Sequence, residues 1–353
     1  MKKLIDSVGY NFFNKNKNLE LSVDSIYSIC IVQPGHIGDL LLSIPMIDQL
    51  RKNFDGHMSL AVTSYTYELA KNLNNIDEII LIEHFRPNYL YNSKKFNIIK
   101  PIKTFKNIKS DVIFELRGDI NIIIPLFLFS KYRFLVGFDV GGGGFLLDKV
   151  LPYPHHKHIS ETFYSFLEGF GVEKPKLKIL DQYLSKSLEN TLNIQNYVTI
   201  AIGTGHKSKE WDDNNFIKLI DFLKNENKKI VLLGKIEENR LKKYDNLAHD
   251  NVINLLNKTT IIEAISIIKY SDAFVGLDAG LTHAAAMLGV KTVAIYSAVN
   301  ELNVWQPFNE FSKVEVVRSK LSCENCGLSN CNNNICMRMI KPEVVYQKLL
   351  EIL

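Results

Sequence analysis

The first apolar segment of this chain, residues 26–33, is followed directly by glycine and polar residues, PGHIGD at 34–39. Two glycines three positions apart allow a tight turn from a strand into a helix, and Asp39 lies near the start of that helix. A carboxylate in this place either caps the helix or acts as a general base that takes a proton from a hydroxyl group. The spacing alone leaves both interpretations open.

A second group of such residues, GLDAGLTHAAAMLG at 276–289, overlaps the end of the apolar segment 273–277. Backbone amides at the start of a small-residue helix bind phosphate, and Gly280 would let a phosphate approach closely. His283 lies in the first helical turn, where the positive end of the helix favours a neutral ring that donates a hydrogen bond. The alternative is that Asp278 caps the helix and His283 packs against a sheet.

Two further groups follow the apolar segments 197–203 and 229–234. The first reads TGHKSKEW at 204–211 and offers a hydroxyl group and two lysines to a diphosphate, although an ordinary solvated loop has the same composition. The apolar segment 229–234 is followed by Glu237 and Glu238. An acidic residue beyond a nucleotide-binding strand often accepts hydrogen bonds from a ribose.

Four of the five cysteines lie close together, with two, four and four residues between successive members. This spacing matches that of a zinc knuckle with cysteine in the place of histidine, and four thiolates can hold one tetrahedral ion. We expect a structural zinc or iron ion here, with free or partly buried thiols as the alternative. The predicted ligands are Cys323, Cys326, Cys331 and Cys336.

An alternating series of strands and helices must position these residues. Short β-branched apolar segments alternate with helical patterns in both halves, which predicts an α/β fold with parallel sheets covered by helices. Thr260 and Glu263 form a capping box that marks a helix start, and Pro342 opens a last amphipathic helix. The expected strands are 26–33, 58–63, 78–82, 111–116, 197–203, 229–234, 273–277 and 291–296, and the expected helices include 40–54, 65–73, 216–223 and 261–270.

The chain has 353 residues, 46% of them hydrophobic and 23% charged, as in an ordinary folded protein of two domains. The segment 172–196 is rich in lysine and lacks periodicity, so we place the domains at 1–180 and 181–353. Two doubly wound domains that face each other would bring both sets of strand ends to one cleft. The net charge of +4 is too small for a dedicated nucleic-acid binder.

The longest uncharged apolar segment, 120–130, is about half as long as a membrane span. The N-terminus lacks the apolar core of a signal peptide, so we expect a cytoplasmic protein. Peripheral contact with the inner membrane stays open, since residues 127–133 mix aromatic and basic side chains. A buried helix followed by a short strand is the alternative for that segment.

The sequences GHIGDLLLSIP at 35–45 and GLDAGLTHAAAMLG at 276–289 resemble glycosyltransferase family 9, the ADP-heptose:lipopolysaccharide heptosyltransferases. The resemblance runs from about residue 26 to the C-terminus. The residues before it have no assigned role. Four other segments follow in the family's order: DVIFELRGD at 111–119, VGFDVGGGGFLL at 136–147, HISETFYSFLEGFG at 158–171 and TGHKSKEW at 204–211.

This resemblance implies the GT-B architecture, with two Rossmann-like domains, an acceptor-binding N-terminal half, a nucleotide-sugar-binding C-terminal half and a last helix that returns to the first domain. It implies inverting transfer of a heptose or related sugar, without a cofactor for catalysis. The implied partners are a nucleotide sugar, ADP-heptose first, and a lipopolysaccharide or other glycan or glycolipid acceptor. Nucleic acid is not expected as a partner.

The resemblance also assigns roles to residues. Asp39 matches the catalytic aspartate. The donor side comprises Thr204, Lys209, Glu238, Asp278, Gly280 and His283, and we assign Gly38, Arg117 and Asp119 to the acceptor side. Ala279 stands where the family has serine or threonine, so one hydroxyl contact to the donor is missing.

Two other classes of protein deserve comparison. A nicotinamide-dependent oxidoreductase would also have doubly wound sheets, but the G-x-G-x-x-G fingerprint does not follow the first strand. A non-catalytic homologue that binds a glycan or a nucleotide is the other alternative, against which the retained Asp39, Lys209 and His283 argue.

Overall fold

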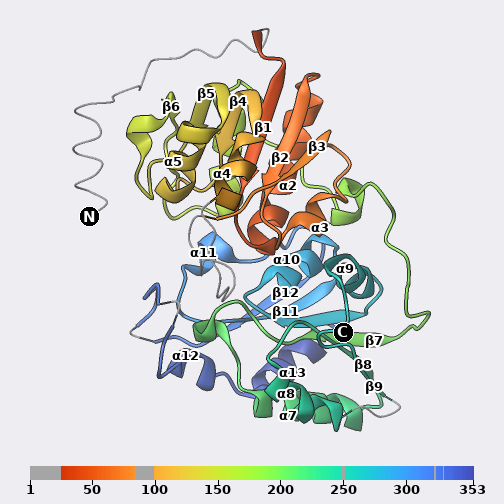
Figure 1. Cartoon of the computed structure of the whole chain (residues 1–353). Helices are drawn as coiled ribbons and strands as arrows, with labels where there is room; N and C mark the ends of the chain where they lie inside the picture. The colour runs from red at the N-terminus through yellow and green to blue at the C-terminus, as the bar shows by residue number, and fades with distance from the viewer. Residues whose placement is uncertain (1–24, 85–98, 248–250, 322, 329) are drawn as a thin grey trace. The chain divides into compact units, whose positions relative to one another are not determined.

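The computed structural model describes residues 25–84, 99–247 and 251–353, apart from 322 and 329. The chain divides into two compact units, Met1–Leu177 and Lys178–Leu353 (Figure 1). This division falls inside the segment 172–196, where we placed the domain junction. The N-terminal extension to which we assigned no role lies outside the described residues.

A parallel sheet of six strands forms the centre of the first unit, in the order β3-β2-β1-β4-β5-β6. Val32 of β1 aligns with Ala61 of β2 on one side and with Glu115 of β4 on the other. The strands are β1 (Ser28–Gln33), β2 (His57–Val62), β3 (Glu78–Leu81), β4 (Lys109–Glu115), β5 (Lys131–Gly137) and β6 (Lys149–Val150).

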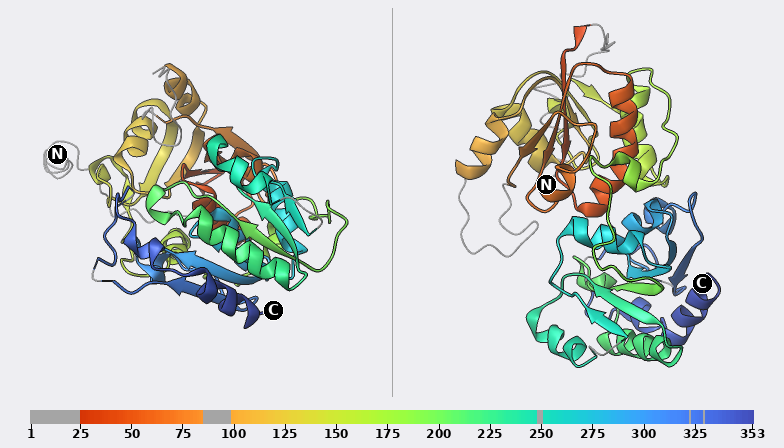
Figure 2. Two further views of the ribbon diagram at one scale, coloured as in Figure 1. Left: turned by 90° about the horizontal axis from the view of Figure 1, so that it is seen from below. Right: turned by 90° about the vertical axis from the view of Figure 1, so that its right-hand side faces the viewer.

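Helices cover both faces of this sheet (Figure 2). Successive side chains of a strand point to opposite faces. Cys30 and Val32 of β1 therefore share one face, where they pack in a core with Phe105 and Leu126. Helices α4 and α5 contribute to that core, while α2 and α6 pack together. The helices are α2 (Ile37–Lys52), α3 (Tyr67–Ala70), α4 (Ile99–Lys106), α5 (Ile120–Phe129) and α6 (Ile159–Glu168), with a 3₁₀ turn, η2 (Gly144–Leu146).

The second unit repeats this strand order around its own core. Its sheet runs β12-β11-β10-β7-β8-β9, again entirely parallel. When the strands of each unit are numbered from its own start, both sheets have the Rossmann order 3-2-1-4-5-6. The strands are β7 (Tyr197–Ala201), β8 (Lys229–Leu233), β9 (Val252–Asn254), β10 (Ala273–Leu277), β11 (Lys291–Tyr296) and β12 (Val314–Arg318).

The last helix belongs to the core of the second unit. Its main packing partners are α7, β11 and β12, and Val345 and Leu349 are fully buried in the second core. Its return to the first domain stays a prediction. The helices are α7 (Asp213–Asn225), α8 (Glu238–Asp245), α9 (Ile261–Lys269), α10 (Gly280–Met287), α11 (Leu302–Trp305), α12 (Ile335–Arg338) and α13 (Pro342–Leu350), and the 3₁₀ turns are η3 (Leu180–Tyr183) and η4 (Lys207–Lys209).

The predicted alternation of strands and helices is confirmed, as is the capping box at Thr260 and Glu263. The apolar segment 120–130 forms α5, which leads directly into β5. Phe127, Phe129 and Tyr132 pack partly buried against the core of the first unit, while Ile124 and Leu128 of α5 are exposed. Within the described parts of the chain, each helix is too short or too polar to cross a membrane.

Candidate active site

The point where strand order reverses defines a functional position in each sheet. In the first unit the chain leaves β1 toward β2 and β3, and later places β4 on the other side of β1. The second unit does the same with β7 and β10. Ligands of open α/β sheets bind beyond the carboxyl ends of the strands at such switch points. The loops after β1, β4, β7 and β10 are therefore the candidate site segments.

Asp39 lies in the first turn of α2, directly after β1. Its Oδ2 accepts a hydrogen bond from the His36 amide at 2.8 Å, which completes a capping box. Its Oδ1 lies 3.3 Å from Nη1 of Arg117, and 12% of the side chain is exposed. A Cβ on Gly35 would lie 2.7 Å from Asp39, so glycine is needed for this close approach. Asp39 is thus a helix cap that also presents one oxygen to a cation.

Arg117 reaches Asp39 from the loop after β4, across the switch point. Glu115, the last residue of β4, supports that loop, because its oxygens accept hydrogen bonds from the amides of Arg117 at 3.2 Å and Gly118 at 2.5 Å. Glu115 is fully buried. Burial raises its pKa to about 8, although these hydrogen bonds and the charge of Arg117 act in the opposite direction. The loop is therefore anchored on a carboxyl group that retains its proton near neutral pH.

The second unit has a comparable ion pair. Here the cation follows the first strand of the unit and the carboxylate follows the fourth, the reverse of the first unit. Lys209, in η4 after β7, places its Nζ 2.7 Å from Oδ2 of Asp278, which follows β10. Only 13% of the Lys209 side chain and 5% of the Asp278 side chain are exposed. The expectation that Asp278 caps α10 is not met, because Ala279 is the N-cap residue and its side chain makes no cap bond. Asp278 instead fixes the ammonium group of Lys209.

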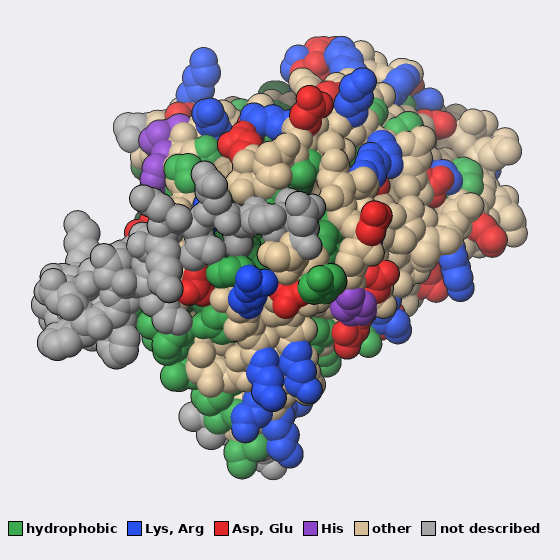
Figure 3. All heavy atoms as spheres, turned by 90° about the horizontal axis from the view of Figure 1, so that it is seen from above, with side chains coloured by type: hydrophobic (Ala, Val, Ile, Leu, Met, Phe, Trp, Pro, Cys, Tyr) green, Lys and Arg blue, Asp and Glu red, His purple; other side chains and the backbone are tan. Residues whose placement is uncertain are grey.

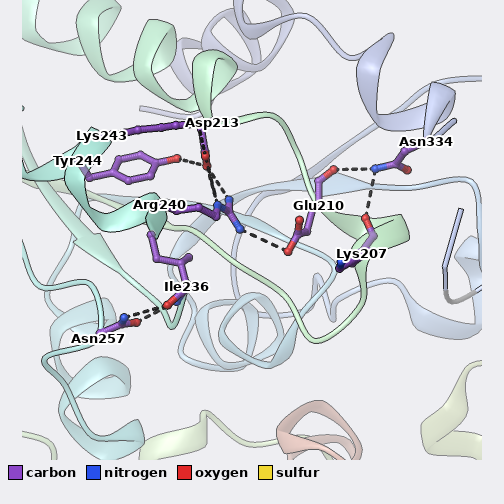
Figure 4. Close-up of polar contacts among 9 residues, drawn as sticks. All are labelled: Lys207, Glu210, Asp213, Ile236, Arg240, Lys243, Tyr244, Asn257 and Asn334. Carbon is purple, nitrogen blue, oxygen red and sulfur yellow. Dashed lines mark hydrogen bonds and ion pairs between the residues drawn. The ribbon is translucent and has the colours of Figure 1, made fainter. Parts of the chain in front are cut away.

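The turn that carries Lys209 is held by side chains from several elements (Figure 4). Arg240 of α8 contacts Glu210 at 3.4 Å and also bonds Asp213 at the start of α7. Lys243 and Tyr244 bond the same Asp213 carboxylate. Burial acts to raise the pKa of Asp213, but the bonds from its three partners outweigh it and lower that pKa below its ordinary value. A charged network therefore supports η4 from the side of α7 and α8.

Helix α10 begins at Gly280, as the predicted phosphate-binding turn requires. Thr282 donates its hydroxyl hydrogen to the carbonyl of Leu277, which closes the turn after β10. His283 occupies the first turn with 3% exposure, and its hydrogen bond to a phosphate stays a prediction. The helix start and the Lys209–Asp278 pair come from loops at one switch point.

The remaining predicted residues lie on the expected loops and helix starts. Thr204 follows β7 and is partly exposed, and Glu238 is the exposed first residue of α8. Gly38 is the second residue of α2. Asp119 is the N-cap of α5, where it accepts a hydrogen bond from the Asn121 amide at 3.0 Å. Of the predicted residues, Asp39 pairs with Arg117, and Lys209 pairs with Asp278.

The predicted four-cysteine metal site is not formed. Among the described residues, which include all four cysteines, no group of three or more His, Cys, Asp or Glu side chains is arranged to hold a metal ion. Cys336 lies in α12 and is buried in the core of the second unit, whereas Cys323 and Cys326 are exposed. The residues therefore do not fit a tetrahedral ion in this arrangement.

Sequence reasoning missed Glu115, Arg240 and Asn334. Glu115 is the polar end of an apolar strand, a signal that could have been noticed. Arg240 lies on a helix of ordinary polar composition, and Asn334 lies among several asparagines. Arg240 contacts Asp213, 27 positions away, and Asn334 contacts Glu210, 124 positions away. Sequence periodicity does not indicate contacts between residues so far apart.

On the face of the molecule in Figure 3, Lys and Arg side chains lie scattered among Asp and Glu, except for one small group of them at the lower edge of the view. Such a mixture does not form an extended basic surface on that face, which agrees with the small net charge.

Two Rossmann-like units, each with an ion pair at its own switch point, define a doubly wound α/β protein, and the solved structures identify its architecture as the GT-B fold. The Escherichia coli heptosyltransferase WaaC with ADP superimposes with a TM-score of 0.72 at 15% identity, over 92% of this chain and 100% of that one. Residues 103–335 match the family model for glycosyltransferase family 9 (heptosyltransferase). The chain belongs to this family, and the expected fold class is confirmed.

Curated relatives point to the same family. Lipooligosaccharide heptosyltransferase 2 of Campylobacter jejuni is 33% identical over 154 residues, or 41% of this chain and 47% of the relative. Lipopolysaccharide heptosyltransferase 3 of Escherichia coli K12 is 23% identical over 288 residues, or 77% of this chain and 83% of the relative. The match spans about half the length of the Campylobacter relative. Because the chain belongs to this family, the alternative of a nicotinamide-dependent oxidoreductase is excluded.

Proposed function

We propose that this protein is an inverting glycosyltransferase that moves a heptose from ADP-heptose to a lipopolysaccharide core or a related glycan acceptor. The observation that carries the proposal is the presence, in a family 9 chain, of a carboxylate–cation pair at the switch point of each sheet. The names of the relatives, lipooligosaccharide and lipopolysaccharide heptosyltransferases, support the sugar and the acceptor class.

Asp39 is the proposed general base. Inversion requires an acceptor hydroxyl oxygen to attack the anomeric carbon from the face opposite the leaving group. The new C–O bond forms as the bond from the anomeric carbon to the diphosphate oxygen breaks, and the hydroxyl proton passes to the Asp39 carboxylate. Arg117 lies 3.3 Å from one oxygen of Asp39, so it orients the carboxylate before the proton arrives. In this scheme the first unit supplies the base.

The second unit is proposed to stabilise the departing nucleoside diphosphate. The ammonium group of Lys209 and the backbone amides at the start of α10 are positive groups at one switch point. Asp278 fixes Lys209 before the donor binds, which reduces the side-chain entropy lost on binding. Thr204 and Gly280 are proposed to contact the donor phosphates, His283 to donate a hydrogen bond to them, and Glu238 to accept one from the ribose.

We propose that catalysis needs no cofactor, because these groups can carry the leaving group's charge. The remaining roles follow the family. Gly38, Arg117 and Asp119 are assigned to the acceptor side. A glycolipid acceptor would bring the protein to the cytoplasmic side of the inner membrane as a peripheral protein. On α5, Ile124 and Leu128 are the exposed apolar side chains nearest in sequence to the basic residues Lys131 and Arg133.

A donor panel tests the proposed function. The full chain is incubated with ADP-heptose, ADP-glucose, UDP-glucose and GDP-mannose, each with heptose-free lipopolysaccharide core, and products are weighed by mass spectrometry. We expect one heptose to be added to the acceptor from ADP-heptose. Asp39→Asn should lose transfer by on the order of 10²-fold while ADP binding persists, because the amide accepts no proton.

A matched control is Asp48→Asn on the same helix, which should transfer like the wild type. Wild-type protein that is folded and leaves every donor unchanged would disprove the transferase assignment. Near-normal turnover of Asp39→Asn would disprove the role of Asp39 alone.

A further inference from the structure

The turn that carries Lys209 has little stability of its own. η4 contains three residues, and its internal hydrogen bonds run from the Lys209 amide to the His206 carbonyl and from the Glu210 amide to the Lys207 carbonyl. Isolated 3₁₀ turns have poor hydrogen-bond geometry and a high entropic cost. The position of Lys209 therefore depends on groups outside the turn.

Asn334 contacts this turn on both sides of Lys209 (Figure 4). Its Nδ2 donates to the Lys207 carbonyl at 3.3 Å and to the Glu210 carbonyl at 3.0 Å. A side-chain amide has two N–H donors, so one group can satisfy both carbonyls. The two carbonyls are drawn toward one point, and the backbone between them is fixed.

The backbone and neighbours of Asn334 hold its amide in this orientation. Asn334 has φ 43° and ψ 36°, a left-handed conformation that asparagine adopts more readily than most residues. The backbone N–H of Asn334 donates to Sγ of Cys331 at 3.4 Å, and Sγ of Cys336 donates to Oδ1 of the Asn334 side chain at 3.8 Å. The side-chain oxygen is thus turned toward Cys336, which leaves Nδ2 directed at the turn.

A second tie joins the same two segments. Nε1 of Trp211 donates to the carbonyl of Ile340 at 2.9 Å, and both residues are buried. The segment 334–340 therefore fastens the chain at residues 207–211 at two points. Since Ser208 is also fully buried, the turn has little room to shift.

We propose that Asn334 is a positioning residue for the donor site: its amide bridges the carbonyls that flank Lys209 and holds the Lys209 ammonium group where it meets Asp278 and a nucleoside diphosphate. The part that concerns the diphosphate rests on the proposed function. The part that concerns the turn rests on the contacts of Asn334 alone.

The test compares Asn334→Asp with Asn333→Asp. Aspartate has the shape of asparagine and tolerates the left-handed conformation, but it has no N–H to donate. The neighbouring control makes the same change in charge, and Asn333 uses its Oδ1 to accept from Arg338, a bond that aspartate keeps. Asn334→Gly is a second variant, which removes the side chain without adding a charge and suits the backbone conformation.

Three measurements follow on all four proteins. Hydrogen–deuterium exchange of a peptide covering residues 204–211 should be faster in Asn334→Asp and Asn334→Gly, and unchanged in Asn333→Asp. Calorimetry should show ADP affinity about tenfold weaker in both Asn334 variants, the loss expected for two bonds that act through another residue. The KM for the nucleotide sugar should rise by a similar factor, while the KM for the acceptor stays unchanged.

Each outcome has a separate meaning. Equal exchange in the Asn333 and Asn334 variants overturns the positioning role, whatever the nucleotide results. Faster exchange with unchanged ADP affinity and donor KM also overturns it, because the turn would then loosen without effect on the site. A wild-type protein that binds no ADP disproves the proposed function, and the exchange comparison still decides whether Asn334 holds the turn.

Discussion

In the proposed function, Lys209 is the side-chain cation on the donor side of the site. Lys209→Ala removes a cation that is fixed against Asp278. We expect ADP affinity to fall about 10- to 100-fold, as for the loss of a hydrogen bond to a charged group, and the difference from the wild type to shrink as salt is added. Isothermal titration calorimetry at several salt concentrations measures this.

The control for that variant is Lys207→Ala. Lys207 is exposed in the same turn, so its replacement changes the net charge equally without touching the Lys209–Asp278 pair. Equal losses in the two variants would mean that Lys209 contributes only through general charge.

Glu115 makes stability depend on pH. Burial raises its folded-state pKa to about 8, above the ordinary value of 4.5, so the folded protein holds this proton to higher pH than the unfolded chain does. The stability that comes from this proton is fully present below about pH 4.5 and is lost as the pH rises through about 8. The free energy of unfolding of the wild type, measured with urea, should therefore decline between those two pH values. The free energy of unfolding of Glu115→Gln should decline less over the same range. Parallel curves would contradict the assignment.

The five thiols should differ in reactivity. Cys323 and Cys326 are exposed, while Cys30 and Cys336 are buried, and burial raises the pKa of Cys30 to about 12. A disulfide reagent should label Cys323 and Cys326 first in the native protein, because their side chains are exposed to it. Digestion and mass spectrometry give the order. One equivalent of zinc or iron together with four protected thiols would instead restore the predicted metal site.

At the scale of single elements, the capping box of α9 provides a direct test. Oγ1 of Thr260 accepts from the Glu263 amide at 3.2 Å, and Oε2 of Glu263 accepts from the Thr260 amide at 2.8 Å. Thr260→Ala should lower the free energy of unfolding by about 1 kcal/mol. Thr259→Ala, one position earlier, is the control in urea unfolding. Equal effects would show that the box adds nothing.

Elements with strong local patterns could be predicted, and elements defined by their neighbours could not. The central strands β1, β7 and β10 are buried on both faces, so they read as continuous apolar segments. β6 and β9 are short edge strands of two and three residues that exist only because a neighbour pairs with them. Likewise, the face of a sheet on which a helix packs depends on that sheet.

The same distinction holds for the site. The motifs around Asp39, Lys209 and Asp278 could be placed after strands, because a strand, a glycine turn and a helix start all leave local signals. Their partners could not be derived, since Arg117 reaches Asp39 from 78 residues away. The failure of the cysteine prediction has a related cause, because spacing does not reveal that Cys336 is buried in a core.

At the scale of the whole molecule, each unit has its own complete sheet and core. We therefore expect residues 178–353 to fold when expressed alone and to bind ADP within about tenfold of the full chain's affinity. Circular dichroism and calorimetry measure both. A fragment that is unfolded, or folded without affinity for ADP, would show that the donor side needs the first unit.

The shared strand order has a consequence for synthesis. Two parallel sheets of the same topology could exchange strands, because each offers edges that the other's strands would fit. The ribosome makes the last strand of the first sheet, ending at Val150, before the first strand of the second, starting at Tyr197. Domains fold as units during translation, N-terminal first. We therefore expect the order of synthesis to favour correct pairing in each sheet, and refolding of the full chain from denaturant, where all strands are present at once, to give a lower yield of folded protein.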